Sequence, residues 1–219
     1  MRFLGGTTSI PPMNVFIKFE VFHKNRYNHI MFDKNNTLSS YFFTRSFHKA
    51  LNPLASIMDL TPEEANDITS KFTQNLSDQG DYFSHRQKVE RWLHEQAIKI
   101  GTRIDNHHPL YFFLTREMVS DQHDNPDMRY MSVKASEIDL ATCTFTIGDS
   151  FCHHKHIETN GKESYGMPYN PYFGQVIGSK NQDAIINGLD ILTQQGSGYV
   201  EVQVWGRPQI TPHPLNNTV

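Results

Sequence analysis

The sequence predicts an α+β protein with a mixed, mainly antiparallel sheet and a helical pair in the N-terminal half. Three observations support this prediction. Apolar residues recur at helical spacing through residues 61–101, short alternating segments dominate the chain after residue 108, and no internal repeat is present. We expect a flexible leader at residues 1–14 and a single domain at residues 15–219, in which the helical pair is an insertion or a subdomain.

The first half of the chain contains two strand signals and two helix signals. Alternating apolar residues predict a strand at residues 15–22, and an aromatic run predicts another at residues 41–43. The segment Thr61-Pro62-Glu63-Glu64 predicts a helix start, because threonine caps well, proline suits the first helical position and the last glutamate completes a capping box. A second helix is expected at about residues 86–100, before Gly101.

The second half contains several short strands and one further helix. Ser179 and Gln182 predict a capping box for a helix that ends at Gly196. Asn160-Gly161 is a turn signal of the hairpin type. Alternation predicts strands at residues 110–115, 129–133, 143–147 and 199–205.

Charge and hydropathy argue against several classes of protein. The 20 basic and 23 acidic residues give a formal charge of −3 without long runs, so we expect no strong footprint for duplex nucleic acid. No apolar run approaches the roughly 18 residues that cross a bilayer, and the opening segment lacks the apolar centre of a secretory signal. The expectation is therefore no membrane insertion, in a protein that is cytoplasmic or exported without a cleavable signal peptide.

The chain has 2 cysteines, Cys143 and Cys152. This number is too small for a disulfide-built scaffold, so we expect reduced thiols. Their close spacing leaves open a bridge across a hairpin, if two paired strands carry them in register.

Residues 151–158 are rich in histidine and suggest a metal site. If this segment is extended, Cys152 and every second residue after it share one face. Imidazole and carboxylate groups on one face suit a divalent transition metal. A metal-binding protein or metal-dependent enzyme that uses His154, His156 and Glu158 is thus one hypothesis. A solvated polar strand or loop is the other interpretation of the segment.

The turn Gly148-Asp149-Ser150 follows a strand signal and resembles the nucleophile block of GDS-type esterases. Those enzymes need an Asp-x-x-His after the serine, whereas Asp105 and His108 of this chain precede it. The alternative is a turn in which Asp149 and Ser150 bind nearby backbone N–H groups.

The segments at residues 110–116, 131–139, 143–150 and 199–205 form an ordered set, with a helix between the last two. In order and spacing this set resembles the catalytic half of ADP-ribosyltransferase-like toxins, nearest to the DNA-modifying members, over about residues 110–210. The resemblance implies NAD as co-substrate, an unknown macromolecular acceptor and Glu201 as the catalytic residue. It also implies that Arg116 binds the pyrophosphate or the acceptor, and that Tyr111 or Phe112 stacks on the nicotinamide.

A carboxylate at Glu201 suits this chemistry, because breaking the nicotinamide–ribose bond develops an oxocarbenium cation that a nearby negative charge stabilises. The first-strand signature of the family is not evident near residues 23–26, and Tyr199 stands where many members have Gln or Glu. The alternative interpretation places Glu201 on a solvated strand face beside Gln203. A further hypothesis is a non-enzymatic protein that binds a partner through the aromatic loop at residues 165–174 and the histidine face.

Overall fold

The computed structural model describes residues 37–49, 52–72, 82–119, 127–159, 161, 170–196 and 198–208. Within these ranges the chain forms helices and a six-stranded antiparallel sheet, which confirms the α+β class. The expected leader, the strand expected at residues 15–22, Asn160 and residues 165–169 of the aromatic loop lie outside the described residues. Across the described ranges, no helix combines the length and the hydropathy that a membrane span needs.

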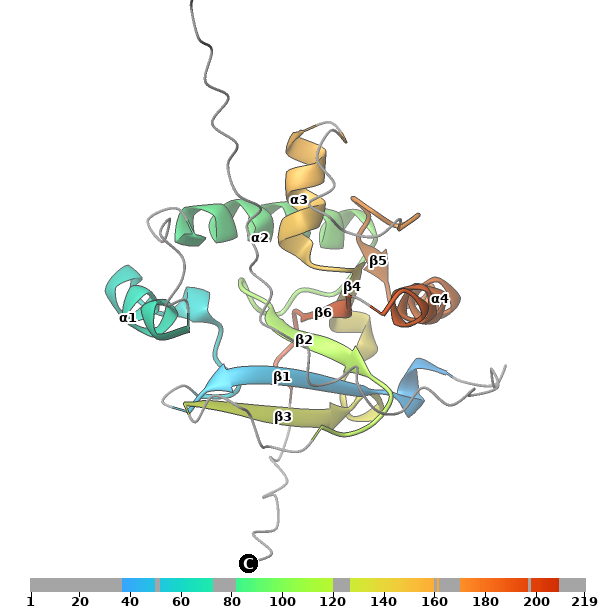
Figure 1. The fold of residues 1–219 in the computed structure, drawn as a ribbon, viewed down its shortest axis with the longest axis horizontal. Helices are drawn as coiled ribbons and strands as arrows, with labels where there is room; N and C mark the ends of the chain where they lie inside the picture. Colours follow the sequence, from blue (N-terminus) through green and yellow to red (C-terminus); the bar gives the residue numbers. More distant parts are fainter. Residues whose placement is uncertain are drawn as a thin grey trace, which may run out of the picture.

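Six strands form the sheet, and every hydrogen-bonded pair of neighbours is antiparallel. They are β1 (Phe42–His48), β2 (Leu110–Thr115), β3 (Met128–Lys134), β4 (Cys143–Ile147), β5 (Ile177–Gly178) and β6 (Val200–Val204). Their order is β3-β1-β2-β6-β4-β5, so β6 lies in the interior of the sheet (Figure 1). The four strands predicted in the second half are confirmed, whereas β5 gave no signal in the sequence.

The described residues form four α-helices: α1 (Pro62–Phe72), α2 (Tyr82–Lys99), α3 (Ser150–Glu158) and α4 (Gln182–Gln194). The predicted capping box of α1 is confirmed. The Thr61 N–H donates to the Glu64 carboxylate at 3.0 Å, and the Glu64 N–H donates to the Thr61 hydroxyl at 3.3 Å. Helices α1 and α2 contact each other as the predicted helical pair.

Helix α4 begins at the predicted place, but its predicted capping box is wrong. The N-cap is Asn181, which makes no side-chain capping bond. Gln182 does not fold back onto the helix, because its Oε1 accepts a hydrogen bond of 2.9 Å from the Leu38 N–H. The Gln182 side chain therefore makes a tertiary hydrogen bond to Leu38 in place of the capping bond that the local pattern predicts.

The extended conformation expected for residues 151–158 is wrong, because this segment forms helix α3. Gly148, with φ of +112°, turns the chain away from β4. The Asp149 side chain then accepts a hydrogen bond of 2.8 Å from the Phe151 N–H and caps the helix. The expectation that Asp149 binds a nearby backbone donor is thereby confirmed. The same expectation for Ser150 is wrong, because its hydroxyl makes no hydrogen bond to a backbone N–H. Side chains that alternation placed on one face are now distributed around a helix.

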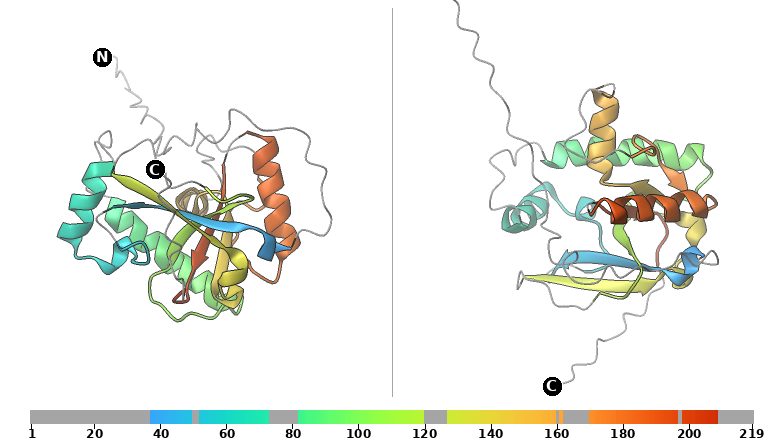
Figure 2. Two further views of the ribbon diagram at one scale, coloured as in Figure 1. Left: turned by 90° about the horizontal axis from the view of Figure 1, so that it is seen from below. Right: turned by 45° about the vertical axis from the view of Figure 1, so that its right-hand side comes forward.

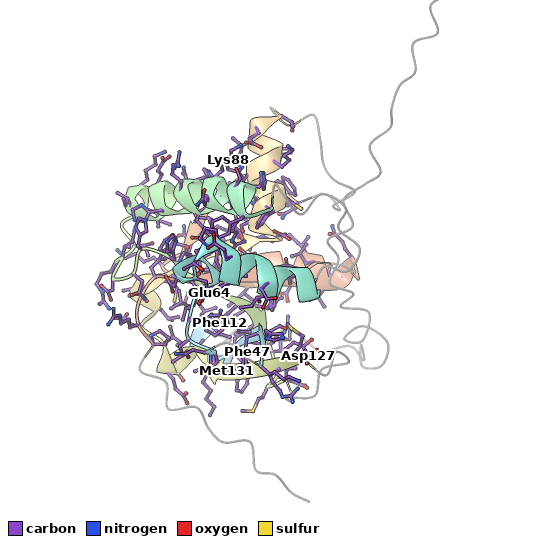
Figure 3. All side chains as sticks on the ribbon, turned by 90° about the vertical axis from the view of Figure 1, so that its left-hand side faces the viewer. Phe47, Glu64, Lys88, Phe112, Asp127 and Met131 are labelled. Atoms are coloured by element: carbon purple, nitrogen blue, oxygen red, sulfur yellow. The ribbon has the colours of Figure 1, made fainter. Side chains whose placement is uncertain are left out.

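The buried apolar side chains form two separate clusters, one on each face of the sheet. Figure 2 shows the helices arranged around the sheet. On one face, α4 packs its apolar residues against β4 and β6 in the main core. Phe112, labelled in Figure 3, belongs to this core and has no exposed surface. On the opposite face, α2 packs Val89, Leu93 and Ala97 against Trp205. The residues of β4 and β6 that share a face with Trp205 are polar, and together with Tyr111 and Phe113 of β2 they form the candidate site.

The contact between α4 and β4 depends on a glycine. A Cβ atom at Gly188 would lie 2.5 Å from Cδ1 of Ile147, which is fully buried. We expect Gly188→Ala to lower the free energy of unfolding by about 1–2 kcal/mol, because overpacking outweighs the gain in helix propensity. Urea denaturation measures the change, with the exposed Asn187→Ala as a control that should be neutral or slightly stabilising. A variant as stable as the wild type would show that Ile147 has room to move.

Candidate functional site

Glu201 lies on the helix-covered face of β6 and is only 5% exposed. Its strand neighbours are Phe113 of β2 and Thr146 of β4. Gln203, on the same face, has no exposed surface. The interpretation of this face as a solvated strand surface is therefore wrong, because α2 and α3 cover it. A carboxylate buried in the centre of a sheet costs free energy unless its neighbours stabilise it.

A chain of hydrogen bonds fixes the orientation of the groups beside Glu201. Trp205 Nε1 donates to the Thr144 hydroxyl at 3.0 Å, and that hydroxyl donates to Gln203 Oε1 at 2.8 Å. The Gln203 amide therefore presents its Nε2 group to the carboxylate and donates to Glu201 Oε1 at 2.8 Å. The amide is held so that its donor side faces the negative charge.

Arg86 of α2 supplies a buried positive charge close to this layer. Its guanidinium carbon lies 3.5 Å from the centroid of the Tyr111 ring and 4.9 Å from that of Phe151. Its Nε donates to Glu90 Oε1 at 3.4 Å. Stacking on aromatic rings and pairing with a carboxylate hold the guanidinium in place.

The pKa of Glu201 is raised to about 7, mainly because burial disfavours the charged form and secondly because Asp149 repels it. The positive charge of Arg86 and the hydrogen bond from Gln203 act in the opposite direction. The carboxyl group therefore changes its charge close to neutral pH. Perturbed pKa values of this kind are concentrated at functional sites.

Tyr111 is the predicted cofactor-binding residue that the structure places near Glu201. Its hydroxyl donates to Glu90 Oε1 at 3.1 Å, and burial raises its pKa well above the usual value. The phenol therefore stays protonated and remains a hydrogen-bond donor. The Glu201 charge is one of the causes of that shift, which places the two groups in electrostatic contact.

Phe112 and Arg116, the other two predicted cofactor-binding residues, do not lie beside Glu201. Phe112 points to the opposite face of the sheet, where its ring lies 6.3 Å from that of Phe43. Arg116 forms an ion pair with Asp190 of α4. Their proposed roles toward NAD therefore find no geometric support next to the carboxylate.

Arg86 and Glu90 are the residues that sequence reasoning missed. The available signal was their position, because both fall at helical spacing within the stripe formed by Val89, Leu93 and Ala97. Charged residues on the apolar stripe of a helix are seldom buried without a partner. Here Arg86 and Glu90 are 7% and 5% exposed and pair with each other.

The Glu90 carboxylate also connects this layer to a hollow of about 580 Å³ at the surface. His108 Nδ1 lies 2.6 Å from Glu90 Oε2, and His108 lines the hollow together with His107 and Asn106. Glu201 is not among the lining residues. The hollow is therefore connected to the buried layer through the contact between His108 and Glu90, and it does not open onto Glu201 itself.

The predicted metal ligands are only partly brought together. His154 and Glu158 lie one turn apart on α3, with 3.8 Å between Nδ1 and the nearer carboxylate oxygen. His156 points elsewhere and meets the ring of Phe173 edge-on at 4.6 Å. Instead of His156, His85 of α2 joins the set.

Both cysteines are free thiols, as expected. Burial raises the pKa of Cys143 and that of Cys152 to about 12. Neither thiol is therefore suited to act as a thiolate nucleophile at neutral pH.

Comparison of the chain with protein-family models gives no match, and comparison with curated proteins and with solved structures gives no significant match either.

Proposed function

We propose that the protein cleaves NAD and transfers ADP-ribose to a macromolecular acceptor, with Glu201 as the carboxylate that stabilises the transition state. The observation that carries this proposal is the burial of Glu201 on an interior strand with a pKa near neutrality. Two neighbours support the same role, because Gln203 orients the carboxylate and Arg86 favours its charged form.

The reaction breaks the bond between the nicotinamide nitrogen and the anomeric carbon of ribose. The bonding electrons leave with nicotinamide, which becomes neutral, and the sugar carries the positive charge as an oxocarbenium ion. The Glu201 carboxylate offsets this charge, and the effect is strong because little water surrounds the group. A nucleophilic atom of the acceptor then bonds to the anomeric carbon and loses its proton to a base or to water.

Glu201 must become accessible for this reaction, since only 5% of it is exposed. The side chains that cover it belong to α2 and to the start of α3, including the Arg86 side chain between Tyr111 and Phe151. Binding of NAD therefore requires these groups to move. The same cover excludes water from the carboxylate before the substrate arrives.

The proposal predicts that cleavage depends on pH. Below pH 7 most of the Glu201 carboxyl is protonated and neutral, so it does not stabilise a cation. We expect kcat/KM for nicotinamide release to rise with pH, with a midpoint near 7, because this parameter reports the ionisation of the free enzyme. The measurement is nicotinamide release from labelled NAD, with nucleic acid and protein supplied as acceptors.

Gln203→Leu provides a matched test of the assignment. It removes the amide that donates to Glu201 Oε1, so the midpoint should move to higher pH. A profile that is flat between about pH 5 and 9, or a midpoint that Gln203→Leu leaves unchanged, would contradict the role of Glu201. Absence of nicotinamide release with every acceptor would contradict the activity itself.

A further inference from the structure

We propose that α2 and α3 bind a divalent transition-metal ion between His85, His154 and Glu158. The potential ligand atoms of these three residues all lie within 4.8 Å of one another. Three ligands at about 2.1 Å from a tetrahedral ion lie about 3.4 Å from one another, so the widest of these separations needs to contract by up to about 1.4 Å to bind an ion.

The distance between His154 and Glu158 fits an ion better than a direct bond. His154 Nδ1 lies 3.8 Å from the carboxylate oxygen, which is too long for a hydrogen bond and suits two ligands on either side of a metal. This Nδ1 atom is buried and has no hydrogen-bond partner. A buried polar atom without a partner is costly, and coordination to a metal would satisfy it.

The three side chains are of the types that a divalent transition-metal ion prefers. His85 and His154 each offer an imidazole nitrogen, and Glu158 supplies the negatively charged ligand.

The surroundings of the three residues are partly aromatic. The His154 ring lies 5.8 Å from that of Trp92, and the His85 ring lies 5.1 Å from that of Phe151. Lys155 Nζ lies 3.8 Å from the Glu158 carboxylate and competes with an ion for it. Two imidazoles and one carboxylate form a donor set that leaves a coordination position open, as in catalytic zinc and non-haem iron sites.

Zn²⁺ and Co²⁺ are the probes for this site, added to chelator-treated full-length protein. Calorimetry should give one Zn²⁺ per chain, and Co²⁺ should produce a visible absorption band. His85→Ala, His154→Ala and Glu158→Gln should each weaken Zn²⁺ binding by at least about tenfold. Lys155→Met should bind Zn²⁺ as tightly as the wild type or more tightly, since it removes the competitor for Glu158.

His156→Ala is the matched control, because His156 lies on the same helix and contacts Phe173 instead. This variant should keep wild-type affinity. Circular dichroism of each variant separates loss of a ligand from loss of the fold. The proposal is overturned if folded wild-type protein binds no stoichiometric Zn²⁺, or if His156→Ala weakens binding as much as His154→Ala does.

Discussion

A Glu201→Gln variant is expected to release nicotinamide from NAD roughly 10²- to 10³-fold more slowly than the wild-type protein. Glutamine keeps the shape of the side chain and can still accept the hydrogen bond from Gln203 Nε2. It carries no charge, so it cannot offset the positive charge of the sugar. Single-turnover measurement of nicotinamide release gives the rate, and the exposed Glu137→Gln should behave like the wild type.

The same variant should be more stable than the wild type at alkaline pH. The pKa of Glu201 is raised from 4.5 to about 7 in the folded state. Below pH 4.5 the group is protonated in both states and does not oppose folding. The folded state then loses stability as the pH rises from 4.5 to about 7, because the unfolded state releases the proton first. We expect Glu201→Gln to exceed the wild type by about 3 kcal/mol at pH 8, and by little at pH 4.

Urea denaturation at the two pH values measures this difference. Loss of activity together with a gain in stability is the pattern of a carboxylate held for chemistry at the expense of the fold. Loss of activity together with loss of stability would instead assign Glu201 a structural role. Equal stability at both pH values would show that the group does not titrate in the folded protein near neutrality.

Local signals in the sequence were sufficient for most of the fold. The capping box at Thr61 and Glu64 depends on neighbouring residues alone, and α1 begins there. Alternation of the valines in β6 reflects the period of a strand with one apolar face, and this pattern survives in the structure. Elements whose cause lies within a few residues of the chain were thus predicted in kind and place, although their bounds differ: the strand expected at residues 199–205 spans Val200–Val204, and the helix expected at about residues 86–100 spans Tyr82–Lys99.

Helix α3 shows where local reasoning failed. Phe151 and Ile157 are the only large apolar side chains in residues 151–158, so neither a strand period nor a helix period is marked by apolar residues. The conformation is decided by the Asp149 cap and by packing on α2, and this packing lies outside any local window. For the same reason His85 was not foreseen as a neighbour of His154.

The candidate site shows that alternation along a strand does not reveal what covers each face of that strand. Alternation establishes that Glu201 and Gln203 share a face, and this is confirmed by their burial on the side of Trp205. It does not establish whether that face meets water or a helix. The cover comes from α3 and from α2, and α2 ends more than 100 residues earlier in the chain. Only the charged residues within the stripe of α2 hinted that a polar layer lay beneath it.

Phe112→Ala is expected to lower the free energy of unfolding by about 3–5 kcal/mol, because it empties a fully buried ring position in the main core. The informative companion is Phe112→Leu, which keeps most of the apolar volume. Since Phe112 lies on the face opposite Glu201, Phe112→Leu should leave the KM for NAD unchanged.

Tyr111→Phe, one residue earlier and on the Glu201 face, removes the hydroxyl that binds Glu90 and should alter KM or kcat. Urea denaturation and NAD kinetics on the same preparations compare the two positions. A raised KM in Phe112→Leu, with stability close to the wild type, would instead support stacking of this ring on the nicotinamide and contradict its assignment to the core.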